Sequence, residues 1–156
     1  MFEIPKSVKN LMNVIRRNGY EAYIVGGCVR DMLLCRTPSD FDVTTSAMPD
    51  EITDMFDRTV AVGKKHGTVG VVTESGIIEV TTFRSDGDYN DFRRPESVKF
   101  VRSLKEDLAR RDFTVNAMAY SDSTGLIDCF GGRDDIKNRI LRTVGDPKTR
   151  FGEDAL

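Results

Sequence analysis

The sequence contains no tryptophan, a single histidine and only three cysteines among its 156 residues. One histidine, His66, leaves little for a multi-histidine metal site or for a mechanism that needs several histidines. The cysteines, Cys28, Cys35 and Cys129, are odd in number and form no Cys-x-x-Cys pair. Both a disulfide-stapled fold and a cysteine-rich zinc site are therefore disfavoured.

Long apolar runs are also missing. No stretch approaches the roughly 18 consecutive apolar residues of a membrane span, and residues 1–6 lack the apolar segment of a signal peptide. The 23 Lys and Arg nearly balance the 25 Asp and Glu, for a net charge of −2, so the overall charge does not advertise a nucleic-acid binder. We expect one cytoplasmic domain without a membrane partner, long enough to build a core without disulfides.

Hydrophobic periodicity predicts alternating helices and strands. The expected helices lie at 6–18, 29–34, 49–56, 103–110, 134–139 and from 147 onward. The expected strands lie at 20–25, 41–44, 59–62, 68–73, 77–83, 118–121, 126–129 and 140–144. Residues 84–97 have no period and are expected to form a loop. Ser103 and Glu106 have the spacing of a capping box, and 114–120 stay open between a helical turn and a strand.

Two aspartates, Asp40 and Asp42, stand two positions apart at the start of an expected strand. In a strand this spacing points both side chains to one face. A carboxylate pair so placed can bridge two divalent cations, as in-line nucleotidyl transfer requires. On its own such a pair is more often an ordinary acidic strand entry, so its context has to decide.

A double glycine, Gly26-Gly27, lies between an expected strand and an expected helix that carries Arg30. Glycines at such a turn let backbone N–H groups approach a phosphate chain, and Arg30 could hold a phosphate oxygen. The segment matches neither a Walker loop nor a Rossmann fingerprint. A simple tight turn is the alternative reading.

A third carboxylate, Glu79, lies in the alternating run 78–83. If its strand neighbours that of Asp40 and Asp42, Glu79 would help to hold the metals and to position an attacking 3′-hydroxyl. The alternative is that Glu79 marks only the solvent side of its strand.

Together these residues resemble a known family. The matching segments are Gly26 to Asp31, Asp40-Phe41-Asp42, Gly63 to Thr68, Arg110 to Ala117, and Glu153-Asp154. Their order and types are similar to those of class II tRNA nucleotidyltransferases (CCA-adding enzymes) and bacterial poly(A) polymerases. The resemblance extends over essentially the whole chain.

The resemblance implies a polymerase-β-like catalytic head that adds CMP and AMP to the 3′ end of tRNA without a nucleic-acid template. It implies Asp40 and Asp42 as ligands of Mg²⁺, with Glu79 as the third catalytic carboxylate. The residues it implies for holding the nucleotide are Gly26, Gly27, Arg30, Arg111, Asp112, Asn116 and Asp154. Among them, Asp112 could accept a hydrogen bond from a ribose hydroxyl and so favour NTP over dNTP.

In the family, a Glu-Asp-x-x-Arg motif reads the base. Glu153 to Leu156 match its first four positions, and the sequence stops before the Arg. Without the guanidinium the ring acceptor atoms of the base would be left unpaired, so we expect this chain to bind CTP and ATP with little preference. Residues 86–95 resemble the family's flexible loop. Its presence favours the interpretation that the protein adds the full CCA end or the terminal A.

We therefore expect an α/β (α+β) fold with a mixed, mostly antiparallel sheet backed by helices. Residues 1–145 would form the nucleotidyltransferase head and 146–156 the truncated start of a neck helix. The expected partners are the tRNA 3′ end, CTP and ATP. A poly(A) polymerase, a non-catalytic nucleotide-binding module and a purely RNA-binding domain are the alternatives.

Overall fold

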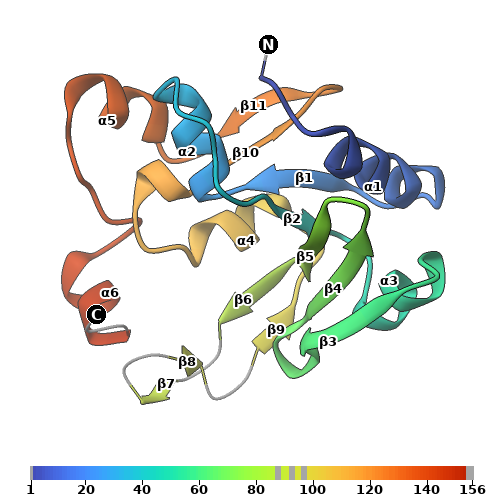
Figure 1. Cartoon of the computed structure of the whole chain (residues 1–156). Helices are drawn as coiled ribbons and strands as arrows, with labels where there is room; N and C mark the ends of the chain where they lie inside the picture. The colour runs from blue at the N-terminus through green and yellow to red at the C-terminus, as the bar shows by residue number, and fades with distance from the viewer. Residues whose placement is uncertain (1, 87–88, 92–93, 96–97, 154–156) are drawn as a thin grey trace.

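The computed structural model describes residues 2–86, 89–91, 94–95 and 98–153. A seven-stranded sheet with the order β11-β10-β1-β2-β5-β4-β3 forms its centre (Figure 1). Only β2 and β5 are parallel, and the other neighbours run antiparallel. The strands are β1 (Ala22–Val25), β2 (Asp42–Thr45), β3 (Thr59–Gly63), β4 (Thr68–Thr73), β5 (Gly76–Thr82), β10 (Met118–Ser121) and β11 (Gly125–Asp128). The expectation of a mixed, mostly antiparallel sheet is confirmed.

Three helices contribute to the main core on one face of the sheet: α1 (Lys6–Arg17), α2 (Gly27–Leu33) and α3 (Pro49–Met55). The apolar residues of α1 recur every three or four positions, and Leu11 and Ile15 are buried against the sheet. This burial is what holds the amphipathic helix in place. No helix in the described part of the chain is both long and apolar enough to cross a membrane.

A second, smaller core lies on the opposite face, where α4 (Leu104–Ala109) meets β1 and β10. Its members are Tyr23, Val25, Phe83, Leu108 and Ala119. The 3₁₀ turn η2 (Thr114–Asn116) connects α4 to β10 and resolves the ambiguity at 114–120 as a turn followed by a strand. This second layer also reaches β2, where Thr44 Oγ1 donates to Asp107 of α4, and Phe83 directly after β5.

The loop expected at 84–97 is wrong for part of that segment. Strand β6 (Arg84–Asp86) pairs with β9 (Val98–Phe100), and β7 (Tyr89–Asp91) pairs with β8 (Arg94–Pro95). Both ribbons extend away from the large sheet (Figure 1). Strands of two or three residues are too short to show an alternating pattern, so their pairing could not be read locally.

Two further expectations need correction. Residues 140–144 form no strand, because only an isolated bridge joins Phe113 to Thr143. Ser103 precedes α4, but its side chain makes no capping hydrogen bond, and the carbonyl of Ser103 accepts from the Asp107 amide instead. The helix itself is present as predicted.

The C-terminal helices are α5 (Gly132–Asn138) and α6 (Pro147–Glu153). At the start of α6, Asp146 Oδ2 accepts a hydrogen bond from the Thr149 amide at 3.2 Å. Asp146 therefore caps α6, as its position before a proline predicted.

Candidate active site

One row of residues runs across neighbouring strands at the edge of the second core. Val25, the last residue of β1, pairs with Asp42 at the start of β2. Val43 pairs with Val80 in the parallel strand β5, so the residues that precede them, Asp42 and Glu79, lie side by side. Because paired residues share a face of a sheet, the double glycine after Val25, Asp42 and Glu79 meet in one place.

The carboxylates of this row influence one another. The pKa of Asp42 is raised above its ordinary value by loss of hydration and then by the negative charges of Glu79 and Asp40, while Arg111 opposes the shift. All three carboxylate residues remain exposed to solvent. The cluster therefore concentrates negative charge that a bound cation would neutralise.

These oxygen donors fit a hard cation such as Mg²⁺, which usually binds one or two carboxylates together with waters and substrate phosphates. In the described part of the chain, no three His, Cys, Asp or Glu side chains come together as a metal site. Asp40 and Asp42 would therefore need oxygens of a bound nucleotide to complete the coordination.

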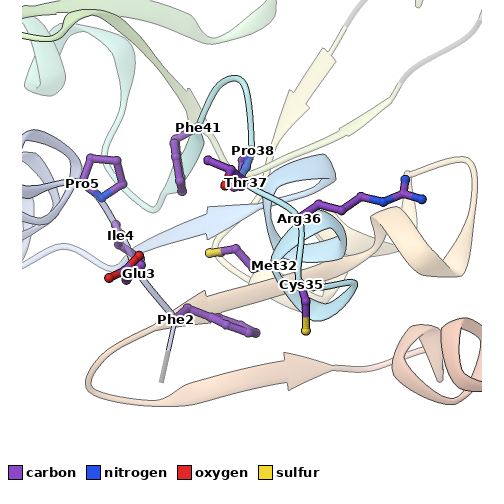
Figure 2. A pocket seen from close by; sticks show the side chains of 10 residues that line it. All are labelled: Phe2, Glu3, Ile4, Pro5, Met32, Cys35, Arg36, Thr37, Pro38 and Phe41. Atoms are coloured by element: carbon purple, nitrogen blue, oxygen red, sulfur yellow. The ribbon is translucent and has the colours of Figure 1, made fainter.

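Phe41, between the two aspartates, packs toward the interior. It lines a cavity of about 670 Å³ between the N-terminal segment and the end of α2 (Figure 2). It also packs against the main core together with Met32. Asp42, the first residue of β2, pairs with Val25 and so lies on the face of the second core. Asp40 lies before the strand, close enough for its charge to raise the pKa of Asp42.

Gly26 has a backbone conformation that only glycine adopts easily, with φ +80° and ψ −134°. Its amide donates to the Met118 carbonyl at 3.2 Å, which fixes the turn against β10. A Cβ at this position would lie 3.2 Å from Nη1 of Arg111. The absence of a side chain at Gly26 therefore lets the Arg111 guanidinium approach the turn.

A chain of hydrogen bonds connects the turn to η2. Arg30 Nη1 donates to Asn116 Oδ1 at 2.9 Å, and Asn116 Nδ2 donates to Asp112 Oδ1 at 3.3 Å. The Asp112 side chain is also fixed by the Phe113 amide, which donates to the same oxygen at 2.6 Å. Two distant parts of the sequence, α2 with Arg30 and the segment 111–118, thus meet at the glycine turn.

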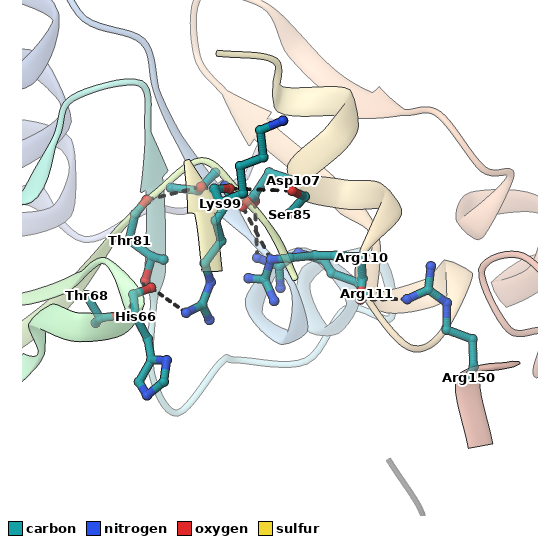
Figure 3. Close-up of polar contacts among 11 residues, drawn as sticks. His66, Thr68, Thr81, Ser85, Lys99, Asp107, Arg110, Arg111 and Arg150 are labelled. Carbon is teal, nitrogen blue, oxygen red and sulfur yellow. Dashed lines mark hydrogen bonds and ion pairs between the residues drawn. The ribbon is translucent and has the colours of Figure 1, made fainter. Parts of the chain in front are cut away.

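Arg111 forms an ion pair with Asp107, a carboxylate that the sequence analysis did not predict to be part of the site. Asp107 is completely buried, and its Oδ2 lies 3.6 Å from Nη2 of Arg111 and 3.1 Å from Oγ1 of Thr44, which donates to it (Figure 3). Its Oδ1 lies 3.5 Å from Nε of Arg110. The only local indication was its position four residues before Arg111 near the end of the expected helix, a spacing at which opposite charges can meet.

The pKa of Arg111 is lowered by burial and by the neighbouring charge of Arg110, and raised by Asp107 and Asp42. A guanidinium remains charged even so, and Arg111 Nε, which is buried, has no hydrogen-bond partner in the described structure. Arg111 is therefore a fixed positive charge with an unused donor, placed between the carboxylate row and the glycine turn.

Helix α6 is fastened to the end of α4. Arg150 donates from Nη2 to the Ala109 carbonyl at 2.6 Å and from Nη1 to the Arg110 carbonyl at 3.1 Å (Figure 3). Asp154, which the resemblance assigns to the nucleotide, lies outside the described residues.

The two glycines allow a matched test of the turn. Gly26→Ala should lower the free energy of unfolding by about 1–3 kcal/mol, because alanine is strained at a positive φ. Gly27→Ala, where the new Cβ would meet only Arg30 at 3.5 Å in a helical backbone, should be neutral or stabilising by about 0.5–1 kcal/mol. Urea denaturation of both variants measures this, and equal effects would contradict the account of the turn.

Comparison with known proteins identifies relatives of this site. Residues 22–142 match the model of the poly A polymerase head domain. A CCA-adding enzyme from Geobacillus thermodenitrificans is 58% identical over 146 residues, which are 94% of this chain and 36% of that protein. The chain thus spans about a third of the length of such relatives.

Solved structures of similar proteins share this fold. The crystal structure of the Bacillus stearothermophilus CCA-adding enzyme in complex with CTP superimposes with a TM-score of 0.87 at 48% identity, over 96% of this chain and 36% of that one. A tRNA nucleotidyltransferase complexed with a primer tRNA and an incoming ATP analog gives a TM-score of 0.72 at 33% identity, over 93% of this chain and 41% of that one.

Proposed function

The chain belongs to the poly A polymerase head-domain family, and on that premise we propose that it transfers nucleotides from CTP and ATP to the 3′ end of tRNA without a template. The observation that carries the proposal is the cross-strand row that places Asp42 between the glycine turn and Glu79. Relatives with CTP, or with primer tRNA and an ATP analog, support this choice of substrates.

In the proposed reaction the terminal 3′-oxygen of the RNA attacks the α-phosphorus of the NTP. A phosphodiester bond forms, the bond to the β-phosphate oxygen breaks, and pyrophosphate leaves together with the proton of the hydroxyl. Mg²⁺ held by Asp40 and Asp42 would activate the hydroxyl and stabilise the leaving oxygens. Glu79, beside Asp42, would orient the attacking hydroxyl.

The triphosphate would lie against the turn. The backbone of Gly26 and Gly27 permits its close approach, while Arg30 and Arg111 supply positive charge from α2 and from the end of α4. Arg30 is held by Asn116 and by Asp31, whose Oδ1 accepts from Arg30 Nε at 2.9 Å. Positioning charges in advance of binding limits what the site must reorganise during transfer.

We propose that Asp112 selects ribose over deoxyribose. Asp112 is exposed, and Phe113 and Asn116 both donate to its Oδ1. The other carboxylate oxygen, Oδ2, would accept the hydrogen bond from the ribose. A hydrogen bond from the 2′-hydroxyl to a carboxylate contributes about 1.5–3 kcal/mol. Asp112→Ala should therefore reduce the preference for CTP over dCTP by roughly tenfold or more. Calorimetric titration with both nucleotides measures it, and an unchanged ratio would exclude this role.

We further propose that residues 1–145 are the catalytic head and that the neck begins at 146, with Asp154 accepting a hydrogen bond from the exocyclic amino group of cytosine or adenine. A tRNA substrate also supports the expected cytoplasmic location.

The activity itself is tested by primer extension. A tRNA that ends before CCA should gain nucleotides from radiolabelled CTP and ATP in the presence of Mg²⁺, whereas an unrelated RNA should not. Extension of any RNA with ATP alone would indicate a poly(A) polymerase. Mg²⁺-dependent CTP binding without incorporation would favour a non-catalytic nucleotide-binding module.

A further inference from the structure

An exposed apolar surface lies on the same face of the sheet as the carboxylate row. It consists of Val60 and Val62 from β3 and Ile77 from β5, whose exposed fractions are 40%, 48% and 57%. The three side chains gather over Gly70 of β4: a Cβ there would lie 2.6 Å from Val60 Cγ2, 2.7 Å from Val62 Cγ2 and 2.9 Å from Ile77 Cγ2. We call Val60, Val62, Gly70 and Ile77 the aliphatic platform.

Strand register makes the platform a direct continuation of the candidate active site. Gly70 pairs with Glu79, and Val60 pairs with Gly70. The row that begins at Val25 and Asp42 therefore continues through Glu79 to the platform on one face. Neighbouring strands lie about 4.8 Å apart, so Gly70 lies roughly 10 Å from Asp42, on the opposite side from the glycine turn.

The three apolar side chains of the platform can meet because the residue at its centre, Gly70, has no side chain. Any larger residue at position 70 would collide with the three branched side chains around it, and glycine inside a strand often marks the close approach of a ligand. The second core ends at Phe83 and Val25 and does not include any platform residue. Among the described residues, this part of the face therefore has no covering helix.

The in-line geometry of the proposed transfer indicates which part of the substrate lies over the platform. With the triphosphate at the glycine turn and the α-phosphorus near Asp42, the attacking hydroxyl has to approach from the side opposite the leaving pyrophosphate. Along the row, that side is Glu79 followed by the platform. A nucleobase or ribose presents a flat, weakly polar surface that suits aliphatic side chains, whereas a phosphate would have no cationic partner among the three.

We propose that the aliphatic platform binds the ribose and base of the RNA's 3′-terminal nucleotide and so directs its 3′-hydroxyl toward Glu79 and Asp42. This inference rests on the proposed function, and it names the surface that receives the acceptor strand. Because the contact is apolar and lacks hydrogen-bond readout, it would accept cytosine and adenine ends alike, as successive additions require.

The test uses a short RNA that carries 2-aminopurine with a 3′-deoxyribose at its end, so that no transfer follows. A second RNA carries the same base three nucleotides upstream. Each is titrated into the chain with Mg²⁺ and CTP. The wild type should change the emission of the terminal base much more than that of the internal base.

The double variant Val62→Thr, Ile77→Thr keeps β-branched residues in exposed positions but adds hydroxyls to the platform. It should bind the terminally labelled RNA roughly tenfold more weakly, since apolar burial contributes about 25 cal/mol per Å², and it should lose the terminal emission change. Its affinity for CTP with Mg²⁺ should be unchanged. Leu34→Thr, at an exposed apolar residue that lies at the end of α2 and outside the platform, is the control and should behave as the wild type.

The outcomes separate the two proposals. A wild type that binds no CTP with Mg²⁺ would overturn the proposed function and this inference with it. Normal CTP binding, with the same terminal emission in the wild type and the double variant, would overturn only the inference. A dimer in sedimentation that the double variant abolishes, without any change in terminal emission, would assign the platform to contact between two copies. Each single substitution should weaken binding of the terminally labelled RNA in part. If the double variant does not fold, the single variants test the inference in its place.

Discussion

Asp40→Asn together with Asp42→Asn should reduce nucleotide incorporation by at least about a thousandfold. The two carboxylates are the proposed metal ligands, and cation stabilisation of a transferring phosphoryl group is worth several kcal/mol, of which each 1.4 kcal/mol is a factor of ten in rate. Single-turnover extension of a tRNA that lacks CCA measures the loss. Incorporation at the wild-type rate by the double variant would contradict the assignment.

Removing the charge of Asp42, which should reduce activity, should at the same time stabilise the fold. Loss of hydration and two neighbouring carboxylates raise the pKa of Asp42 in the folded state, so the folded protein binds this proton more tightly than the unfolded chain does. Stability from this group is therefore lost as the pH rises from the unfolded pKa of 3.8 through the folded pKa. At pH 7 without metal, Asp42→Asn should raise the melting temperature.

This gain in stability should shrink as the pH falls toward 3.8, because the wild-type carboxyl then becomes neutral as well. Mg²⁺ should raise the melting temperature of the wild type more than that of Asp42→Asn. A variant that melts lower than the wild type at pH 7 would show that Asp42 has a structural role instead.

Arg111→Lys should weaken the binding of CTP in the presence of Mg²⁺ by roughly ten- to a hundredfold. Lysine keeps the charge beside Asp107, so the buried carboxylate retains a partner, but it loses the planar donors that reach the glycine turn. A charge-assisted hydrogen bond contributes about 1.5–3 kcal/mol. Calorimetric titration of both proteins with CTP measures the change.

Arg110→Lys is the matched control, because Arg110 also lies near Asp107 and on the same helix end but makes no close approach to Gly26. It should keep the wild-type affinity for CTP. Equal weakening in both variants would mean that Arg111 acts through general charge, and normal binding by Arg111→Lys would remove it from the nucleotide site.

Local sequence patterns predicted most of the fold. Strong alternation and helical periodicity placed the central strands and α1 correctly, since these elements bury one face against a core. The pairs Gly26-Gly27 and Asp40/Asp42 stood out in the sequence because each combines an uncommon residue choice with a position at the edge of an element.

What the sequence did not reveal depends on pairing between distant segments. The buried Asp107 resembles any acidic residue of a short helix until Thr44 and Arg111 are seen around it. Likewise, Gly70 looks like a weak point in a strand until β3 and β5 bring Val60 and Ile77 over it. The strand expected at 140–144 failed because its apolar residues had no neighbouring strand to pair with beyond one bridge.

A crystal structure of the chain with Mn²⁺ and a non-hydrolysable CTP analogue would test the central claim most directly. Anomalous scattering should place the metal ions against the carboxylates of Asp40 and Asp42, with the triphosphate lying along Gly26 and Gly27 and within reach of Arg111. Metal ions bound elsewhere, or a triphosphate that avoids the double-glycine turn, would contradict the account.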